Sequence, residues 1–126
     1  MENLPIELAS ERGRIQLRLC CLRMGADLCV TLSGGDRPHI GAVALSEAAL
    51  GEARHPTTSV ITLRNHREDA LARRIACQVA AHSGVAVCVA CGIHVEAIQP
   101  KELADVLAMA EELTRSLLER LSNREQ

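Results

Sequence analysis

Three histidines stand at or beside the ends of apolar segments, each next to a glycine or a carboxylate. They are His39 in GGDRPHIGAVAL, His66 in NHRED and His94 in GIHVEAI. Imidazoles can donate hydrogen bonds to a phosphate or ligate a divalent metal ion. They show no local metal spacing, so they act together only if the fold gathers them in one pocket. Taken singly, each is better explained as a hydrogen-bonded histidine at the edge of the core.

Glycines and charged residues beside these histidines complete the candidate site. The pair Gly34 and Gly35 could let backbone N–H groups approach an anion, although it also suits an ordinary hairpin turn. Carboxylates could orient the imidazoles or hold a bridging cation, and whether a metal takes part stays open. The residues predicted to bind a ligand are Gly34, Gly35, Asp36, His39, Gly41, His66, Arg67, Glu68, Gly92, His94 and Glu96.

Other chemical patterns carry less weight. Cys88 and Cys91 match Cys-x-x-Cys, but they lie in an apolar run predicted as a strand, where residues three apart point to opposite faces. Arg14 and Arg37 could reach a phosphate, but a solvated strand face explains Arg14 equally well. His55 and His82 are interpreted as structural.

The composition excludes several classes of function. The chain has 126 residues, 48% hydrophobic, with a net charge of −2 and no Phe, Trp or Tyr. Without a basic surface or aromatic stacking platforms, we expect no nucleic-acid partner. No apolar run is long enough for a membrane helix, and no secretory signal is recognisable, so we expect a cytoplasmic protein with reduced thiols. Residues 1–126 are predicted to form a single domain.

The hydrophobic periodicity predicts the elements that must position these residues. Period-two patterns indicate strands over 14–23, 27–33 and 40–45, expected to form an antiparallel meander. A β-branched strand is predicted over 58–63, and a strand buried on both faces over 85–90. One helix should begin with Asn65 or His66 as its cap and end at Gly84, and another should begin at Pro100. Residues 1–12 are expected to be loose or a short edge segment, and 47–57 a mobile loop.

These elements define an α+β fold. The prediction is a mostly antiparallel sheet of about five to six strands with two long helices packed on it. Whether the helices share one face stays open. The apolar stripes of the helices also suggest a dimer.

The motifs GGDRPHIGAVAL, NHRED and GIHVEAI, in this order, resemble those of the small D-type accessory proteins of gallate and hydroxyarylic-acid decarboxylases. These are similar to what are called prenylated-flavin chaperones, and the resemblance runs from about Gly13 to the last helix. It implies a fold like that of the proteasome-assembly chaperones and a homodimer. Asn65 stands where we expect a glycine in the second motif.

The resemblance also implies a function. The protein would have no decarboxylase activity, and would bind prenylated FMN (or FMN), the product of a flavin prenyltransferase. It would deliver this cofactor to a UbiD-type decarboxylase or help mature it there. Two alternatives stay open: a metal-dependent hydrolase using His39, His66 and His94, and an assembly chaperone that binds no ligand.

Overall fold

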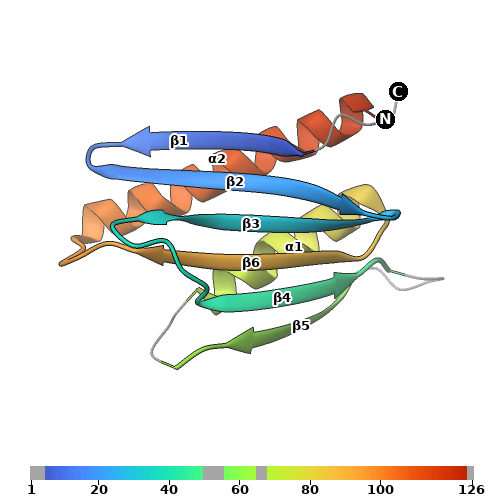
Figure 1. The fold of residues 1–126 in the computed structure, drawn as a ribbon, viewed down its shortest axis with the longest axis horizontal. Helices are drawn as coiled ribbons and strands as arrows, with labels where there is room; N and C mark the ends of the chain where they lie inside the picture. Colours follow the sequence, from blue (N-terminus) through green and yellow to red (C-terminus); the bar gives the residue numbers. More distant parts are fainter. Residues whose placement is uncertain (1–4, 50–55, 65–67, 125–126) are drawn as a thin grey trace.

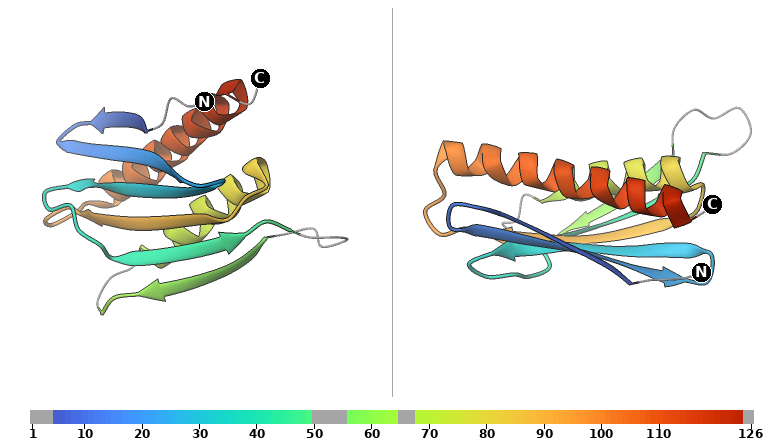
Figure 2. Two further views of the ribbon diagram at one scale, coloured as in Figure 1. Left: turned by 45° about the vertical axis from the view of Figure 1, so that its right-hand side comes forward. Right: turned by 90° about the horizontal axis from the view of Figure 1, so that it is seen from above.

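A computed structural model describes residues 5–49, 56–64 and 68–124 of the chain (Figure 1). Its described part forms one six-stranded sheet with both helices on the same face (Figure 2). The predicted α+β architecture is therefore confirmed. The elements are β1 (Ile6–Arg12), β2 (Ile15–Met24), β3 (Asp27–Gly35), β4 (Ala42–Glu47), β5 (Thr57–Thr62), α1 (Asp69–Ser83), β6 (Val87–His94) and α2 (Pro100–Arg124).

The order of strands in the sheet is β1-β2-β3-β6-β4-β5. The predicted antiparallel pairing of 14–23 with 27–33 is confirmed by β2 and β3, but the predicted third strand of the meander, 40–45, is β4 and does not lie beside β3. The last strand, β6, lies between β3 and β4, parallel to β3 and antiparallel to β4. Residues 36–41 therefore cross the end of β6 instead of closing a tight hairpin turn. Alternating hydrophobicity shows which face of a strand is buried, but it does not identify the neighbouring strand. The N-terminal segment is a paired edge strand, β1, which pairs with β2 along its length.

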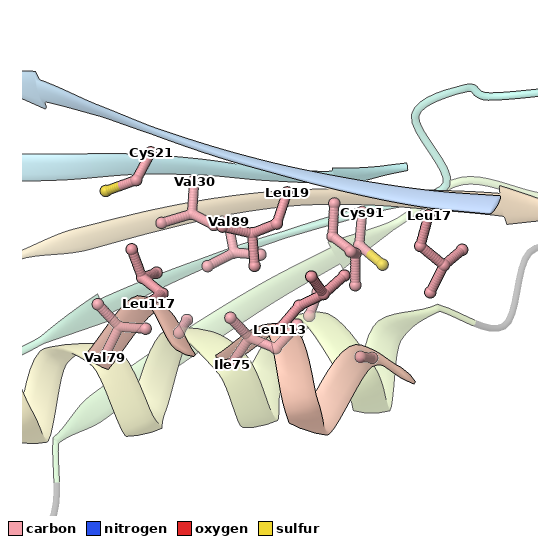
Figure 3. Close-up of a cluster of buried hydrophobic side chains, with 14 of the residues drawn as sticks. Leu17, Leu19, Cys21, Val30, Ile75, Val79, Val89, Cys91, Leu113 and Leu117 are labelled. Atoms are coloured by element: carbon pink, nitrogen blue, oxygen red, sulfur yellow. The ribbon is translucent and has the colours of Figure 1, made fainter. Parts of the chain in front are cut away.

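The core lies between the sheet and the two helices (Figure 3). Its labelled residues come from three strands, β2, β3 and β6, and from both helices: Leu17, Leu19, Cys21, Val30, Val89, Cys91, Ile75, Val79, Leu113 and Leu117. All of them are buried, which confirms the alternation predicted for the first two strands. Without aromatic rings, aliphatic side chains fill this layer, and their interdigitation holds the helices on the sheet.

The other face of the sheet has no helix on it in the described part of the chain (Figure 2). In β6, Val87, Val89 and Cys91 are buried toward the helices, whereas Cys88 and Ala90 are half-buried on the opposite face. The prediction of a strand buried on both faces is therefore wrong. An apolar run of small residues has the same composition whether one face is covered or two.

The helix ends follow the predicted signals in part. Gly84 ends α1 in the left-handed conformation (φ 74°), and Pro100 begins α2, both as predicted. The N-cap of α1 is Glu68, which makes no side-chain cap hydrogen bond. The predicted cap at Asn65 or His66 is therefore wrong, and those two residues lie outside the described ones. His82 Nε2 lies 2.7 Å from Ser122 Oγ, a contact that joins α1 to α2.

Candidate ligand-binding site

The candidate site lies at the edge of the sheet where β3 and β6 end. These strands are parallel, and Gly35 at the end of β3 pairs with His94 at the end of β6. The segment that follows β3 crosses this edge, and the Gly41 N–H donates to the Cys91 carbonyl oxygen at 2.9 Å. Because of this crossing, residues of GGDRPHIG contact residues of GIHVEAI and Glu68 of NHRED.

His39 and Glu68 form the most buried polar pair of this site. His39 Nε2 lies 3.1 Å from Glu68 Oε1, with side chains only 24% and 12% exposed. The same carboxylate oxygen accepts the Ile93 N–H at 3.3 Å, and His39 Nδ1 lies 3.0 Å from the Arg37 carbonyl oxygen. Both ring nitrogens thus face oxygen acceptors. This pair ties the 36–41 segment to the start of α1.

Two glycines make this close approach possible. A Cβ atom on Gly92 would clash with the backbone carbonyl of His39. A Cβ atom on Gly41 would lie 2.5 Å from Glu68 Oε2, well inside van der Waals contact. Gly92 therefore requires glycine because backbone occupies the space of its side chain, whereas a side chain at Gly41 would displace the carboxylate of Glu68.

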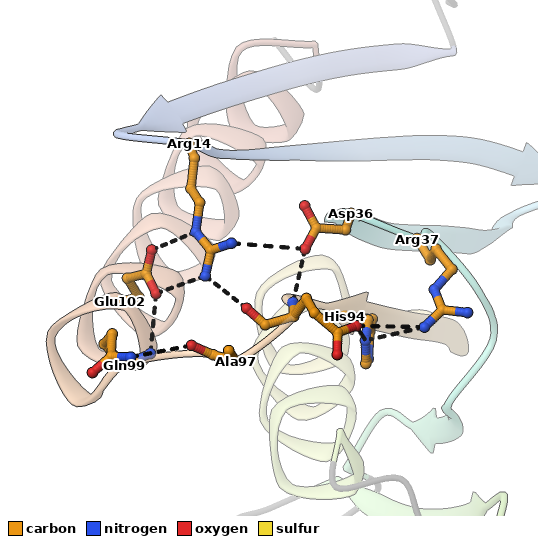
Figure 4. Close-up of polar contacts among 8 residues, drawn as sticks. Arg14, Asp36, Arg37, His94, Ala97, Gln99 and Glu102 are labelled. Atoms are coloured by element: carbon orange, nitrogen blue, oxygen red, sulfur yellow. Dashed lines mark hydrogen bonds and ion pairs between the residues drawn. The ribbon is translucent and has the colours of Figure 1, made fainter.

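His94 belongs to a second, more exposed cluster (Figure 4). Its Nε2 lies 3.2 Å from Glu96 Oε1 and 3.5 Å from Arg37 Nη2. Asp36 joins the segment after β3 to the end of β6 through two hydrogen bonds. The Asp36 N–H donates to the His94 carbonyl oxygen at 2.6 Å, and Asp36 Oδ2 accepts the Glu96 N–H at 2.7 Å. Arg37 is 74% exposed, so its guanidinium is accessible to an anion at this edge.

Arg14 and Glu102 join the site, and the sequence did not assign them to it. Arg14 Nε donates to Glu102 Oε2 at 2.7 Å, and its Nη2 donates to Glu102 Oε1 at 3.0 Å and to the Glu96 carbonyl at 2.8 Å (Figure 4). The hydrogen bond from Arg14, then that from the Gln99 N–H, lowers the pKa of Glu102 to about 2. Arg14 thus binds the start of α2 instead of lying on a merely solvated strand face.

This pairing predicts a pH-dependent contribution to stability. The Glu102 pKa falls on folding from an ordinary value of 4.5 to about 2, so its contribution is complete above pH 4.5 and is lost as pH falls toward 2. We expect Glu102→Gln to melt at a lower temperature than the unsubstituted protein at pH 7, with a difference that disappears near pH 2. Thermal unfolding followed by circular dichroism measures this, and Glu119→Gln controls for the loss of a charge on α2. A difference independent of pH would contradict it.

An apolar cavity of about 400 Å³ opens beside the polar site, between the start of α1, the end of β6 and the first turns of α2. Glu68 and His94 line it, and its other lining residues are Ala70, Leu71, Ile93, Val95, Ile98, Leu103, Val106 and Leu107. Leu103 and Leu107 belong to the apolar stripe of α2. In the structure both are half exposed, at 50% and 51%, because they face this cavity.

The structure thus brings most of the predicted site residues to one edge. Gly35, Asp36, His39, Gly41, Glu68, Gly92, His94 and Glu96 all lie there. Gly34 is buried against β2 at Gln16 and Leu17. The predicted His66 and Arg67 lie outside the described residues. Among residues 5–49, 56–64 and 68–124, no group of three or more His, Cys, Asp or Glu side chains could hold a metal ion.

The fold is similar to that of a solved structure. That structure, the crystal structure of a novel chaperone complex for yeast 20S proteasome assembly, aligns with a TM-score of 0.61 over 95% of each chain. The sequence identity is 12%, so this likeness shows the fold alone. The predicted proteasome-assembly-chaperone-like fold is therefore confirmed.

The family follows from the sequence comparisons. The model of the prenylated flavin chaperone LpdD-like domain matches residues 11–122, so the chain belongs to this family. Protein LpdD of Lactiplantibacillus plantarum is 25% identical over 111 residues, which cover 86% of this chain and 79% of that protein. The resemblance in the three motifs is thereby confirmed. In the described part of the chain, neither helix is long and apolar enough to cross a membrane.

Proposed function

We propose that this protein binds prenylated FMN at the edge where β3 and β6 end, and passes it to a UbiD-type decarboxylase. The observation that supports this most is the meeting of His39, Glu68 and His94 beside an apolar cavity. Small-molecule sites combine an apolar hollow with a few polar groups that converge on it. Membership of the prenylated flavin chaperone family supports the choice of ligand.

Different residues would contact different parts of such a ligand. The exposed Arg37 guanidinium, beside His94, would bind the phosphate, and Glu96 would hold both donors in place. His39 and Glu68 would hold residues 36–41 against the flavin ring. Aliphatic side chains would cover the ring in place of aromatic ones. His66 and Arg67 are proposed as further donors. We propose that these side chains bind the phosphate without a divalent cation.

In this proposal the protein is an accessory without catalytic activity. It would take the flavin from a flavin prenyltransferase in the cytoplasm, shield it, and release it to the decarboxylase with no bond made or broken. The alternative metal-dependent hydrolase would use His39, His66 and His94 together. His66 lies outside the described residues, among which no group of three or more His, Cys, Asp or Glu side chains could hold a metal ion. An assembly chaperone without a ligand is the alternative that the following experiment separates.

The test is an anaerobic titration of the purified protein with prenylated FMN, followed by absorbance or calorimetry. We expect micromolar or tighter binding, weakened at least about tenfold in the double variant Arg37→Gln/His94→Gln, because charge-assisted bonds to the phosphate are lost. The control is Arg18→Gln, an arginine that is equally exposed (74%) on another part of the sheet. An absence of binding at micromolar ligand would contradict the proposal. Partner association that survives the double variant without any flavin would favour the ligand-free chaperone.

We further propose that the protein forms a homodimer through the open face of the sheet. The stripes first expected to supply the interface are mostly buried under the sheet, at Val79, Leu113 and Leu117 among others. Strand register instead places apolar residues side by side across the open face: Leu22, Cys29, Cys88 and Leu45 in one row, and Ala90, Val43 and Ile61 in the next. A two-fold axis brings the same surface patch of both protomers together, and uncharged side chains can pack there against their own copies without repulsion between like charges.

This interface predicts the effect of charge on association. Leu45 is 55% exposed and Ile61 is 73% exposed. Leu45→Lys/Ile61→Lys would place like charges in a desolvated, symmetric contact, so we expect a dimer to dissociate into monomers at micromolar concentration. Sedimentation velocity measures this. Leu107→Lys, equally exposed but on α2, should leave the dimer intact; dissociation in that variant alone would place the interface on the helices.

A further inference from the structure

The apolar cavity continues the polar site on the side of the helices. Among the described residues that line it, Glu68 and His94 are the polar ones, and both belong to the site described above. Its walls are Leu71 from α1, Ile93 and Val95 from β6 and its end, and Leu103 and Leu107 from α2. A molecule bound at His94 therefore lies next to this apolar cavity.

The cavity is open because the two helices leave a gap at this end. The α2 stripe is buried at Val106, Ala110, Leu113 and Leu117, whereas Leu103 and Leu107 are half exposed. These leucines occupy core-facing positions of the same helix, yet no side chain of the described residues fills the hollow in front of them. Half-exposed leucines grouped around a hollow favour an apolar guest, because covering them removes apolar surface from water.

We propose that this cavity receives the isoprenoid-bearing end of the flavin and so selects prenylated FMN over FMN. The inference rests on the proposed function, and it assigns the selectivity to Leu71, Leu103 and Leu107. The two flavins share their phosphate and ribityl chain, and they differ by the apolar isoprenoid unit. A volume of about 400 Å³ lies within the range of small-molecule sites and accommodates one end of such a ligand.

The experiment compares the dissociation constants of FMN and prenylated FMN for each variant. We expect the unsubstituted protein to prefer prenylated FMN by at least about tenfold, the discrimination that even one methylene can give in an apolar pocket. Leu103→Gln/Leu107→Gln should bring this ratio close to one, because it weakens the binding of prenylated FMN more than that of FMN. Arg37→Gln should weaken both flavins equally and preserve the ratio. Leu22→Gln, 48% exposed on the open face of the sheet, is the matched control.

The outcomes separate this inference from the proposed function. If the unsubstituted protein binds neither flavin, both the proposed function and this inference are wrong. If it binds both without preference, or if Leu103→Gln/Leu107→Gln keeps the preference, the inference alone is wrong. Leu107→Met, which conserves volume and apolarity, should retain the ratio, so a loss there would show a packing effect instead of a subsite. Loss of decarboxylase binding with an unchanged ratio would make the cavity a protein-docking site and overturn the inference.

Discussion

Gly92→Ala is expected to destabilise the folded protein by at least about 3 kcal/mol, at the upper end for overpacked positions. The added Cβ would clash with the His39 carbonyl and lie 3.1 Å from the Gly41 nitrogen. Both neighbours are backbone, and the Gly41 N–H is already held by the Cys91 carbonyl at 2.9 Å. The crossing segment can therefore move away only by breaking that bond and withdrawing His39 from Glu68. Urea denaturation gives the stability, and flavin titration gives the accompanying loss of affinity.

The matched control is Gly25→Ala in the turn between β2 and β3. Gly25 has a φ of +62° with nothing near its missing side chain, so alanine there meets only backbone strain, about 1–2 kcal/mol. Its flavin affinity should not change. Equal stability of the two variants would show that the 36–41 segment yields easily, and that Gly92 is not what holds this edge together.

The sequence predicted which residues face the core and that β2 pairs with β3, but not which strands that are distant in the chain are neighbours. Leu17, Leu19 and Val30 were placed on the correct faces because alternation directly records burial. The position of β6 between β3 and β4 depends on pairing between segments that lie far apart in the chain. A local pattern holds no information about such pairing, so the segment that forms β4 was predicted as the direct neighbour of β3.

The candidate site was predictable in its composition but not in its connections. His39, Glu68 and His94 could be selected because each stands beside glycine or an acid at the end of an apolar segment. Arg14 and Glu102 could not, because their hydrogen bond exists only where the β1–β2 turn meets the start of α2. A turn arginine and a carboxylate in a first helical turn are each ordinary when read alone.

The cavity was missed because periodicity cannot distinguish a leucine in the core from one that lines a hollow. Leu103 and Leu107 continue the same helical spacing as the buried Leu113 and Leu117. Their exposure depends on how far α1 and α2 separate at that end, which is a property of the packed helices. The absence of aromatic residues was a usable signal, since large rings often fill such gaps.

Gly41→Ala is expected to displace the Glu68 carboxylate while leaving the rest of the fold in place. The new methyl carbon would lie 2.5–2.7 Å from the carboxyl atoms of Glu68, which form the end of a flexible side chain. Turning away removes Glu68 from His39 and from the Ile93 N–H, so we expect a loss of about 1–3 kcal/mol in stability. Flavin affinity should fall about tenfold, because the crossing segment loses its attachment to α1.

A double-mutant cycle with Glu68→Ala identifies the cause. Once the carboxylate is gone, the methyl group of Ala at position 41 has room, so Gly41→Ala should cost much less in that background than alone. Two changes that act through the same contact are strongly non-additive, with a coupling of about 0.5–3 kcal/mol, whereas independent changes add. Additive losses in urea denaturation would mean that the methyl group strains the backbone itself. In that case Glu68 would not be the residue that fastens GGDRPHIG to the helix.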